Sequence, residues 1–366
     1  MNYENLLHNI ALTMVPEVGP ILSKYLISYC GNAENVFKSS SKKLAKIPGI
    51  GPKVIESLKN ATPFEKAEKQ IEFIDRNECK IYLFHDDDYP KRLKHFEASP
   101  LVLYGKGAIN TNHRRTVAII GTRSPTELGK INCEKIVQGL KKYNVQIISG
   151  LAYGIDTCAH KSSVEKDIET VGILGHGLDK IYPASNKPLV KKMIQNGGIL
   201  TEFPIKTRPD RENFPMRNRI IAAMSDAVIV VESKRSGGSI ITTEFANSYN
   251  KDVFAVPGRV NDEVSEGCNK LIKQTKAHLL ESAEDIGYIM RWEEMDSNKT
   301  IQPKLFVDLN DEEQRVVDLL KTEEEYEIDK IAFSLALSTS QLASILLNLE
   351  FKGVIKSLPG NSYMLI

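Results

Sequence analysis

Four glycine-rich turns contain the residues of this sequence that are best suited to chemistry. They occupy residues 121–129, 149–156, 172–179 and 236–244, and each includes or follows an apolar run typical of a β-strand. Glycine lets backbone N–H groups approach an anion, and a helix that follows such a turn adds the positive end of its dipole. Open α/β sheets bind ligands at the edge where their strands end. Four turns at that edge therefore predict an anion-binding site.

Cations and aromatic rings accompany these turns and indicate the class of anion. The planar fork of arginine donates paired hydrogen bonds to phosphate, and aromatic rings stack on unpaired bases. The cations are Arg123, Lys187, Lys191, Lys192, Arg208, Arg211, Arg217 and Arg219, and the rings are Tyr153, Tyr182, Phe203 and Phe214. We interpret Lys192 and Arg211 as solvated surface charges, whereas Arg123, Arg217 and Arg219 are the stronger candidates. The pattern predicts a polyanionic ligand.

The turns lack the fingerprints of two common nucleotide sites. The first turn carries Arg123 where the dinucleotide pattern GxGxxG requires a glycine. The second strand ends in Ser149 and Gly150, without the carboxylate that would bind a ribose. The chain also contains no GxxxxGK[ST] sequence for binding the phosphates of ATP. The pattern therefore disfavours NAD and leaves ATP hydrolysis without a P-loop.

No pair of nucleophile and base stands out, so no catalytic residue is predicted. His160 precedes a helical segment and is interpreted as a capping or core residue. Asp156 and Asp179 each follow a glycine-rich loop and are expected to orient it through backbone hydrogen bonds. Five scattered cysteines without a CxxC pair indicate reduced thiols and no metal site. We therefore expect neither a cofactor nor a metal.

Composition adds three expectations. The formal net charge of +1 is low for a protein that coats duplex DNA, so any nucleic acid should bind in a local pocket. No stretch approaches 18 consecutive apolar residues, and the first residues lack the basic start of a signal peptide. Together with the reduced thiols, this predicts a cytoplasmic protein that does not enter a membrane.

The α/β region spans residues 65–290. Within 113–290, β-branched apolar runs alternate with helix-like segments, which is typical of parallel strands buried on both faces. The predicted fold is α/β, a Rossmann-like, doubly wound parallel sheet. Residues 65–112 form a connector with a helix and two additional strands.

The segment 1–64 contains a hidden duplication. The sequences PEVGP at 16–20 and PGIGP at 48–52 lie about 32 residues apart, and each precedes a helical pattern. This predicts a helix-hairpin-helix (SAM-like) helical domain. Gly49, Gly51 and Lys53 form a secondary candidate for a phosphate contact, with a plain helix connector as the alternative reading.

Residues 291–304 are polar and are predicted to be a linker, followed by a compact unit at 305–366. Three amphipathic helices and a hairpin with a Pro-Gly-Asn turn predict a winged-helix domain. The expected recognition helix, 338–352, carries only Lys352 as a base and Glu350 as an acid. Readers of the major groove usually present several polar or basic side chains there. A protein contact or a structural role is therefore expected for this domain.

These motifs together resemble those of the DprA/Smf family of DNA-processing proteins over nearly the whole chain. They are GTRSPTELG at 121–129, SGLAYGIDTCAH at 149–160, LGHGLDKIYPASN at 174–186, TEFP at 201–204, FPMRNRIIAAMS at 214–225, SGGSIIT at 236–242, VFAVPG at 253–258 and GCNKLI at 267–272. The chain departs from the usual family pattern at Leu128, where tyrosine is common, and at Ala223, where glycine is common.

The resemblance implies a non-enzymatic function. It implies single-stranded DNA (ssDNA) in a positive pocket of the Rossmann-like domain, a homodimer through that domain, and loading of RecA during natural transformation. Arg123 and Lys187 would hold phosphates, Gly121 and Gly150 would let the strand approach, and residues 217–219 would form the pocket floor. The expected DNA-binding residues are Gly121, Thr122, Arg123, Ser149, Gly150, Lys187, Phe203, Phe214, Arg217, Asn218, Arg219, Gly237, Gly238 and Ser239.

Two other functions remain open from the sequence. The segment 236–244 also resembles the PGGxGTxxE motif of LOG-type nucleotide phosphoribohydrolases, in which Glu244 and Arg217 would act on an N-glycosidic bond. A structural adaptor whose anion pocket is vestigial is the other alternative.

Overall fold

The structure is a computed structural model that describes residues 3–61, 63–294, 309–321, 326–358 and 362–365. The chain divides into two compact units, residues 1–295 and 296–366. The predicted boundary at residue 64 therefore lies inside the first unit. Most of the predicted linker, residues 295–304, falls outside the described residues.

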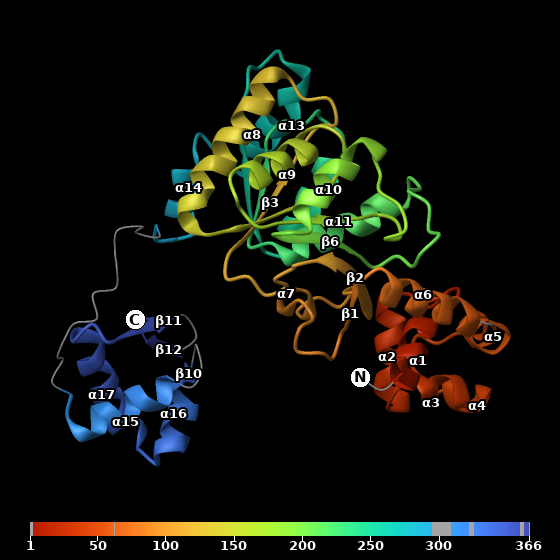
Figure 1. The fold of residues 1–366 in the computed structure, drawn as a ribbon, viewed down its shortest axis with the longest axis horizontal. Coiled ribbons are helices and arrows are strands. Elements are labelled where there is room, and N and C mark those ends of the chain that lie inside the picture. Colours follow the sequence, from red (N-terminus) through yellow and green to blue (C-terminus); the bar gives the residue numbers. More distant parts are fainter. Residues whose placement is uncertain (1–2, 62, 295–308, 322–325, 359–361, 366) are drawn as a thin grey trace. The chain divides into compact units, whose positions relative to one another are not determined.

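Six helices form the N-terminal part of the first unit (Figure 1). They are α1 (Tyr3–Thr13), α2 (Pro20–Cys30), α3 (Ala33–Lys38), α4 (Ser41–Leu44), α5 (Pro52–Asn60) and α6 (Phe64–Arg76). The duplicated sequences adopt the same backbone, since Gly19 caps α2 and Gly51 caps α5 with proline as the next residue. Glu17 and Gly49 both have a left-handed φ, of 65° and 80°. Because glutamate tolerates this conformation less well than glycine, the second copy has the less strained turn.

A nine-stranded sheet forms the centre of the first unit, in the order β1-β2-β6-β5-β4-β3-β7-β8-β9. Its strands are β1 (Lys80–Leu83), β2 (Val102–Gly107), β3 (Thr116–Ile120), β4 (Gln146–Ser149), β5 (Thr170–Ile173), β6 (Gly197–Thr201), β7 (Ala227–Val230), β8 (Asp252–Ala255) and β9 (His278–Leu279). The seven strands from β6 to β9 are parallel, whereas β2 runs antiparallel to β6 and β1 antiparallel to β2. The chain moves outward from β3 to β6 and then returns to β7 on the other side of β3. The β3–β7 boundary is therefore the topological switch point, where ligands of such sheets bind.

Helices cover both faces of the sheet, as a doubly wound fold requires. They are α7 (Lys91–Lys94), α8 (Glu127–Leu140), α9 (Ile155–Glu165), α10 (Lys187–Met193), α11 (Asn213–Met224), α12 (Gly238–Ser248), α13 (Glu266–Lys273) and α14 (Ala283–Ile289), with short 3-10 turns at Lys141–Tyr143, Ala184–Asn186 and Glu263–Ser265. Val117 and Ile119 of β3 pack in one core with α8, α9 and α14, whereas Ala118 and Ile120 pack in another with α11 and α12. This alternation explains the continuous apolar runs, because each strand is buried on both faces.

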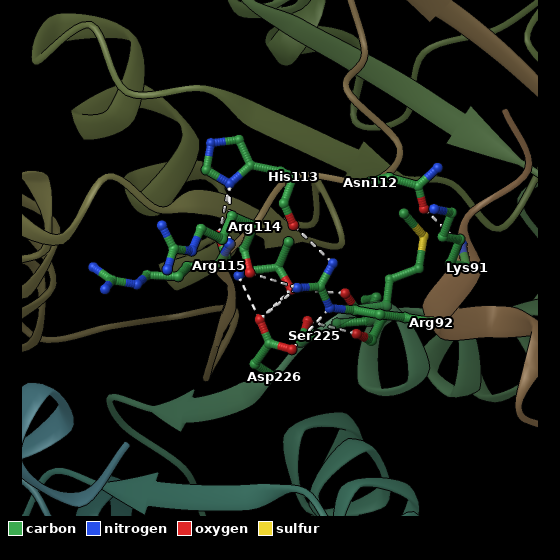
Figure 2. A network of polar contacts seen from close by, with 11 residues as sticks. Lys91, Arg92, Asn112, His113, Arg114, Arg115, Ser225 and Asp226 are labelled. Atoms are coloured by element: carbon green, nitrogen blue, oxygen red, sulfur yellow. Dashed lines mark hydrogen bonds and ion pairs between the residues drawn. The ribbon is translucent and has the colours of Figure 1, made fainter. Parts of the chain in front are cut away.

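Arg92 fastens the connector to the amino ends of β3 and β7 (Figure 2). Its Nε and Nη2 each donate to a carboxylate oxygen of Asp226 at 2.8 Å. It also donates to the backbone oxygens of His113 and Arg114, at 2.8 and 2.9 Å. Asp226 Oδ2 in turn accepts from the backbone N–H of Thr116 at 2.8 Å. One guanidinium and one carboxylate thus join three segments at the edge opposite the glycine-rich turns.

The second unit is a winged-helix domain, as predicted. It contains α15 (Asp311–Leu320), β10 (Tyr326–Glu327), α16 (Ile328–Leu335), α17 (Thr339–Phe351), β11 (Ile355–Leu358) and β12 (Ser362–Leu365), with the sheet order β10-β12-β11. Capping boxes begin α15 at Asn310 and α17 at Ser338. Lys352, just after α17, forms an ion pair of 2.6 Å with Glu313. The single base expected near the recognition helix is therefore engaged within the domain.

Among the described residues, no single helix is both long and apolar enough to cross a membrane. Within the ranges that the structure describes, one pair of helices, α16 and α17, meets the test of length and composition jointly, and it is bent by 112°.

Candidate nucleic-acid interface

Two turns at the switch point are bonded directly to each other and to β7. The backbone N–H of Thr122 donates to the backbone oxygen of Glu232 at 2.7 Å, which joins the turn after β3 to the end of β7. The backbone oxygen of Thr122 accepts from the N–H of Ile155 at 3.2 Å. These bonds bring the turns that carry Gly121, Thr122 and Gly150 to one edge of the sheet, as the sequence predicts.

Close packing between these turns requires glycine at two positions. Gly154 has a φ of +82°, and a Cβ there would lie 2.2 Å from the backbone oxygen of Thr122. A Cβ on Gly150 would lie 1.6 Å from Nη1 of Arg217. The glycines therefore let the turn after β4 lie against the turn after β3 on one side and a guanidinium on the other. Here, glycine serves protein packing as well as any approach of a ligand.

Arg217 is buried beneath the turn after β4. Only 4% of its surface is exposed, and its Nη1 donates to the backbone oxygen of Ile173 at 3.0 Å. Burial lowers the pKa of the Arg217 guanidinium to about 10, although the charge of Asp156 opposes that shift. Asp156 Oδ2 accepts from the N–H groups of Gly150 and Ala152 at 3.1 and 3.4 Å. Asp156 thus orients this turn, as predicted, and Arg217 remains a cation below it at neutral pH.

An exposed cation and three rings form a chain of neighbours, each near the next, in the turns at this edge. The guanidinium carbon of Arg123 lies 5.3 Å from the ring centre of Phe214. Phe214 is 6.2 Å from the ring of Tyr182, which is 6.2 Å from the ring of Tyr153. Tyr182 and Tyr153 are 39% and 48% exposed. We call this set, Arg123, Phe214, Tyr182 and Tyr153, the aromatic line.

Lys187 lies at the start of α10 and is exposed. The residue before it, Asn186, is buried and donates from Nδ2 to the backbone oxygen of Leu151 at 3.1 Å and to Oγ1 of Thr157 at 2.8 Å. These bonds tie the start of α10 to the turn after β4. The exposed Lys187 therefore follows directly on a residue that is tied to that turn.

The turn before α12 presents exposed backbone at the same switch point. Gly237 and Gly238 are exposed, and a Cβ on Gly238 would meet no atom within 4 Å. Asn218 donates from Nδ2 to the backbone oxygen of Gly238 at 3.2 Å, and the buried Ser239 hydroxyl lies 2.8 Å from that of Ser233. Asn218 and Ser239 therefore support the turn, while its glycine backbone is open to a ligand.

The side chains of the predicted pocket floor, residues 217–219, have three different partners in the structure. Successive residues of a helix point about 100° apart, so the three side chains of α11 diverge. Arg219 pairs instead with the buried carboxylate of Glu202. Its charge also helps burial to lower the pKa of Lys24, on α2, to about 8. Arg219 is thus engaged with Glu202, and its charge acts on Lys24 of the N-terminal helices.

Two further candidates are placed differently from the other turn residues. The Ser149 side chain is fully buried and donates to the backbone oxygen of Ile119 at 2.6 Å, so only its backbone could meet a ligand. Phe203 is half-buried, and its N–H donates to Oγ1 of Thr201 at 3.1 Å. The rings that join Phe214 are those of Tyr182 and Tyr153, not the ring of Phe203. The secondary candidates Gly49, Gly51 and Lys53 lie in the α4–α5 hairpin, outside the sheet turns.

Glu232 is a functional residue that the sequence did not single out. Its carboxylate accepts from the backbone N–H of Thr126 at 2.9 Å and from the Thr126 hydroxyl, and Thr126 caps α8. A Cβ on Gly129 would lie 2.3 Å from that carboxylate. The sequence contained one indication of this role, because the apolar run AVIVVE ends in the acidic residue Glu232. Glu232 fixes both ends of the turn that carries Arg123.

His160 lies in the core of the first unit, and Glu244 is exposed on α12. His160 is fully buried with Nδ1 2.7 Å from Oγ1 of Thr170, and burial lowers its pKa to about 3. This places it in the core, one of its two predicted roles. In the part of the chain that the structure describes, no hydrogen bond or ion pair joins Glu244 to Arg217. The arrangement therefore gives the phosphoribohydrolase alternative no support.

Family models match most of the chain. The model described as DNA recombination-mediator protein A matches residues 80–291, and the DprA winged helix domain matches residues 303–361. Protein Smf of Synechocystis is 38% identical over 276 residues, which cover 72% of this chain and 67% of that protein. The DNA processing protein DprA of Streptococcus pneumoniae is 40% identical over 201 residues, which cover 55% of this chain and 71% of that protein. The putative DprA of Mycobacterium tuberculosis is 30% identical over 320 residues, covering 83% and 82%.

Solved structures agree. The crystal structure of DprA from Streptococcus pneumoniae superposes with a TM-score of 0.66 at 30% identity, covering 81% of this chain and all of that one. The structure of DprA from Helicobacter pylori was described for its single-stranded DNA binding mode. It superposes with a TM-score of 0.54 at 29% identity, covering 59% of this chain and 98% of that one. The chain therefore belongs to the DprA/Smf family and has a role in DNA processing and recombination.

Proposed function

We propose that this protein binds ssDNA at the carboxyl edge of its Rossmann-like sheet and delivers it to a recombinase. The aromatic line carries this proposal. An exposed arginine beside three rings offers a phosphate contact and stacking surfaces at once, and stacking requires bases that are free of a duplex. The exposed turn at Gly237 and Gly238 and the cation Lys187 border the same edge. The binding mode named for the Helicobacter pylori relative supports the same ligand.

The finer parts of the proposal concern partners. We propose that the protein forms a homodimer through the Rossmann-like unit and contacts RecA, so that RecA is loaded on incoming strands in natural transformation. The match to a model for recombination mediators supports this assignment.

RecA-dependent ATP hydrolysis on ssDNA coated with single-strand-binding protein tests the mediator role. The wild-type chain should shorten the lag before hydrolysis, and Arg123→Ala should restore the lag because the strand is no longer captured. A wild-type chain that binds ssDNA but leaves the lag unchanged would contradict the RecA part alone. A chain that neither binds ssDNA nor changes the lag would contradict the whole proposal.

A further inference from the structure

Two of the five cysteines face each other between α8 and α9. These helices pack side by side in the first unit (Figure 1). Cys133 Sγ lies 4.0 Å from the backbone oxygen of Ile155, three residues before Cys158. Cys158 Sγ lies 3.7 Å from the backbone oxygen of Lys130, three residues before Cys133. This reciprocal arrangement brings the two thiols together, close enough for each to shift the pKa of the other.

The two thiols are inequivalent in a way that suits oxidation. Cys158 is partly exposed, whereas Cys133 is 0% exposed. The neighbouring Cys133 thiol lowers the pKa of Cys158, with smaller help from the charges of Lys161 and Lys130, although burial and the charge of Glu134 oppose that shift. The same contact and burial raise the pKa of Cys133. Cys158 is therefore the more nucleophilic thiol, and Cys133 is a protonated neighbour within reach.

We propose that Cys158 and Cys133 form a reversible redox pair, oxidised by hydrogen peroxide to a disulfide that joins α9 to α8. The Cys158 thiolate attacks one peroxide oxygen and the O–O bond breaks, giving a sulfenic acid and hydroxide. The Cys133 thiol then attacks the Cys158 sulfur, the S–O bond breaks, and water leaves with the thiol proton. One peroxide accepts two electrons from the two thiols. Excess dithiol reductant reverses the process by thiol–disulfide exchange.

The position of the pair gives the modification a structural consequence. The turn that carries Arg123 leads into α8, and the turn of residues 150–154 leads into α9. A disulfide requires a sulfur separation of about 2.05 Å, shorter than a thiol contact, so the two sulfurs must move toward each other and the bond then ties α8 to α9. Chemical oxidation of the pair does not depend on DNA binding, so it stands whether or not the proposed ligand is correct.

Cys79 offers a matched control within the same chain. It is also partly exposed, but burial raises its pKa, and its own hydrogen bond goes to the backbone oxygen of Asn77. Treating the reduced full-length protein with hydrogen peroxide, blocking free thiols with N-ethylmaleimide and mapping peptides by mass spectrometry compares the sites directly. We expect a Cys133–Cys158 disulfide, reversed by dithiothreitol, while Cys79 remains alkylated. Cys158 should react faster than Cys79, because a lowered pKa enlarges the thiolate fraction of Cys158 and a raised pKa reduces that of Cys79.

Two variants separate the chemistry from simple exposure. Cys133→Ser should abolish the disulfide and leave Cys158 as a sulfenic acid that dimedone traps. Cys79→Ser should form the disulfide at the wild-type rate. Oxidation of Cys79 as fast as Cys158, or peroxide-treated protein in which Cys133 is still alkylated while Cys158 is over-oxidised, would overturn the proposal. Circular dichroism and the melting temperature establish that each variant is folded.

Discussion

The guanidinium of Arg217 lies directly beneath Gly150, so close that a Cβ on Gly150 would come within 1.6 Å of its Nη1. The terminal nitrogen is held by the backbone oxygen of Ile173, and the charge faces Asp156. The guanidinium is thus confined on several sides. The turn after β4 therefore depends on the absence of a side chain at one position.

Gly150→Ala should displace Arg217 or lift the turn above it. We expect a loss of about 1–3 kcal/mol in the free energy of unfolding, typical of an overpacked interior. Gly172→Ala is the matched control, since its Cβ would make only ordinary contacts at 3.4–3.5 Å. The control should be neutral or stabilising by about 0.4–1 kcal/mol, through the entropy of the unfolded chain. Urea unfolding measures the stability of both variants. Equal stabilities of Gly150→Ala and Gly172→Ala would show that the Arg217 side chain can move aside at no cost in free energy.

Glu232→Gln tests the carboxylate that fixes the turn carrying Arg123. The amide keeps the size but turns one acceptor into a donor facing the bonds from Thr126. We expect a loss of about 1–3 kcal/mol in stability and, per folded molecule, weaker ssDNA binding by roughly fivefold. Glu244→Gln makes the same change at an exposed carboxylate of α12 and is the control. It should change neither the stability nor the affinity for ssDNA. Unchanged affinity in folded Glu232→Gln would mean that the turn holds its shape without the carboxylate.

His160 should make the protein sensitive to acid. Its folded pKa of about 3 lies below its ordinary value of 6.5 because burial disfavours the cation. As pH falls below 6.5, the unfolded state takes up a proton that the folded state refuses, so stability is lost progressively toward pH 3. This group adds a slope of at most about 1.4 kcal/mol per pH unit. His160→Asn, which can keep a bond to Thr170, should flatten the slope in urea unfolding between pH 6.5 and 4, whereas exposed His95→Gln should leave it unchanged.

Arg92 should contribute stability without contributing to the ligand site. Arg92→Ala removes both bonds to Asp226 and two to backbone oxygens, and we expect a loss of about 1.5–3 kcal/mol. Arg92→Lys keeps the charge but not the fork, so it should recover only part of that loss. Affinity for ssDNA per folded molecule should stay at the wild-type value for both variants, because the network lies at the opposite edge of the sheet. Reduced affinity for ssDNA in a fully folded variant would show that Arg92 contributes to DNA binding.

The sequence predicted the sheet better than it predicted the direction of individual side chains. Runs such as TVAII and AVIVV identify strands because burial on both faces demands uninterrupted apolar residues. The two-residue strand β9 has no such signature, since His278 and Leu279 are both exposed. The winged helix was predicted correctly because its caps at Asn310 and Ser338 are local signals.

In the candidate site, too, local features were predicted from the sequence and side-chain directions were not. The glycine-rich turns were recognisable because their composition is local, whereas the roles of Arg217 and Arg219 depend on where a helix faces. Two residues apart on α11, their side chains are rotated by about 200° about the helix axis and therefore point to nearly opposite sides. The partner of Glu232 lies 106 positions earlier in the sequence, and no local pattern reveals such a pairing.

Fluorescence anisotropy of a labelled oligo-dT strand and a duplex of equal length, over a salt series, tests the central claim most directly. Arg114→Ala is the matched control, because this exposed arginine precedes β3 at the opposite edge of the sheet. We predict preference for the single strand, weakened about 10- to 100-fold by Arg123→Ala, with the salt dependence reduced by about one ion. Arg114→Ala should bind almost as wild type. Equal affinity for strand and duplex, or binding that Arg123→Ala leaves unchanged, would contradict the proposed interface.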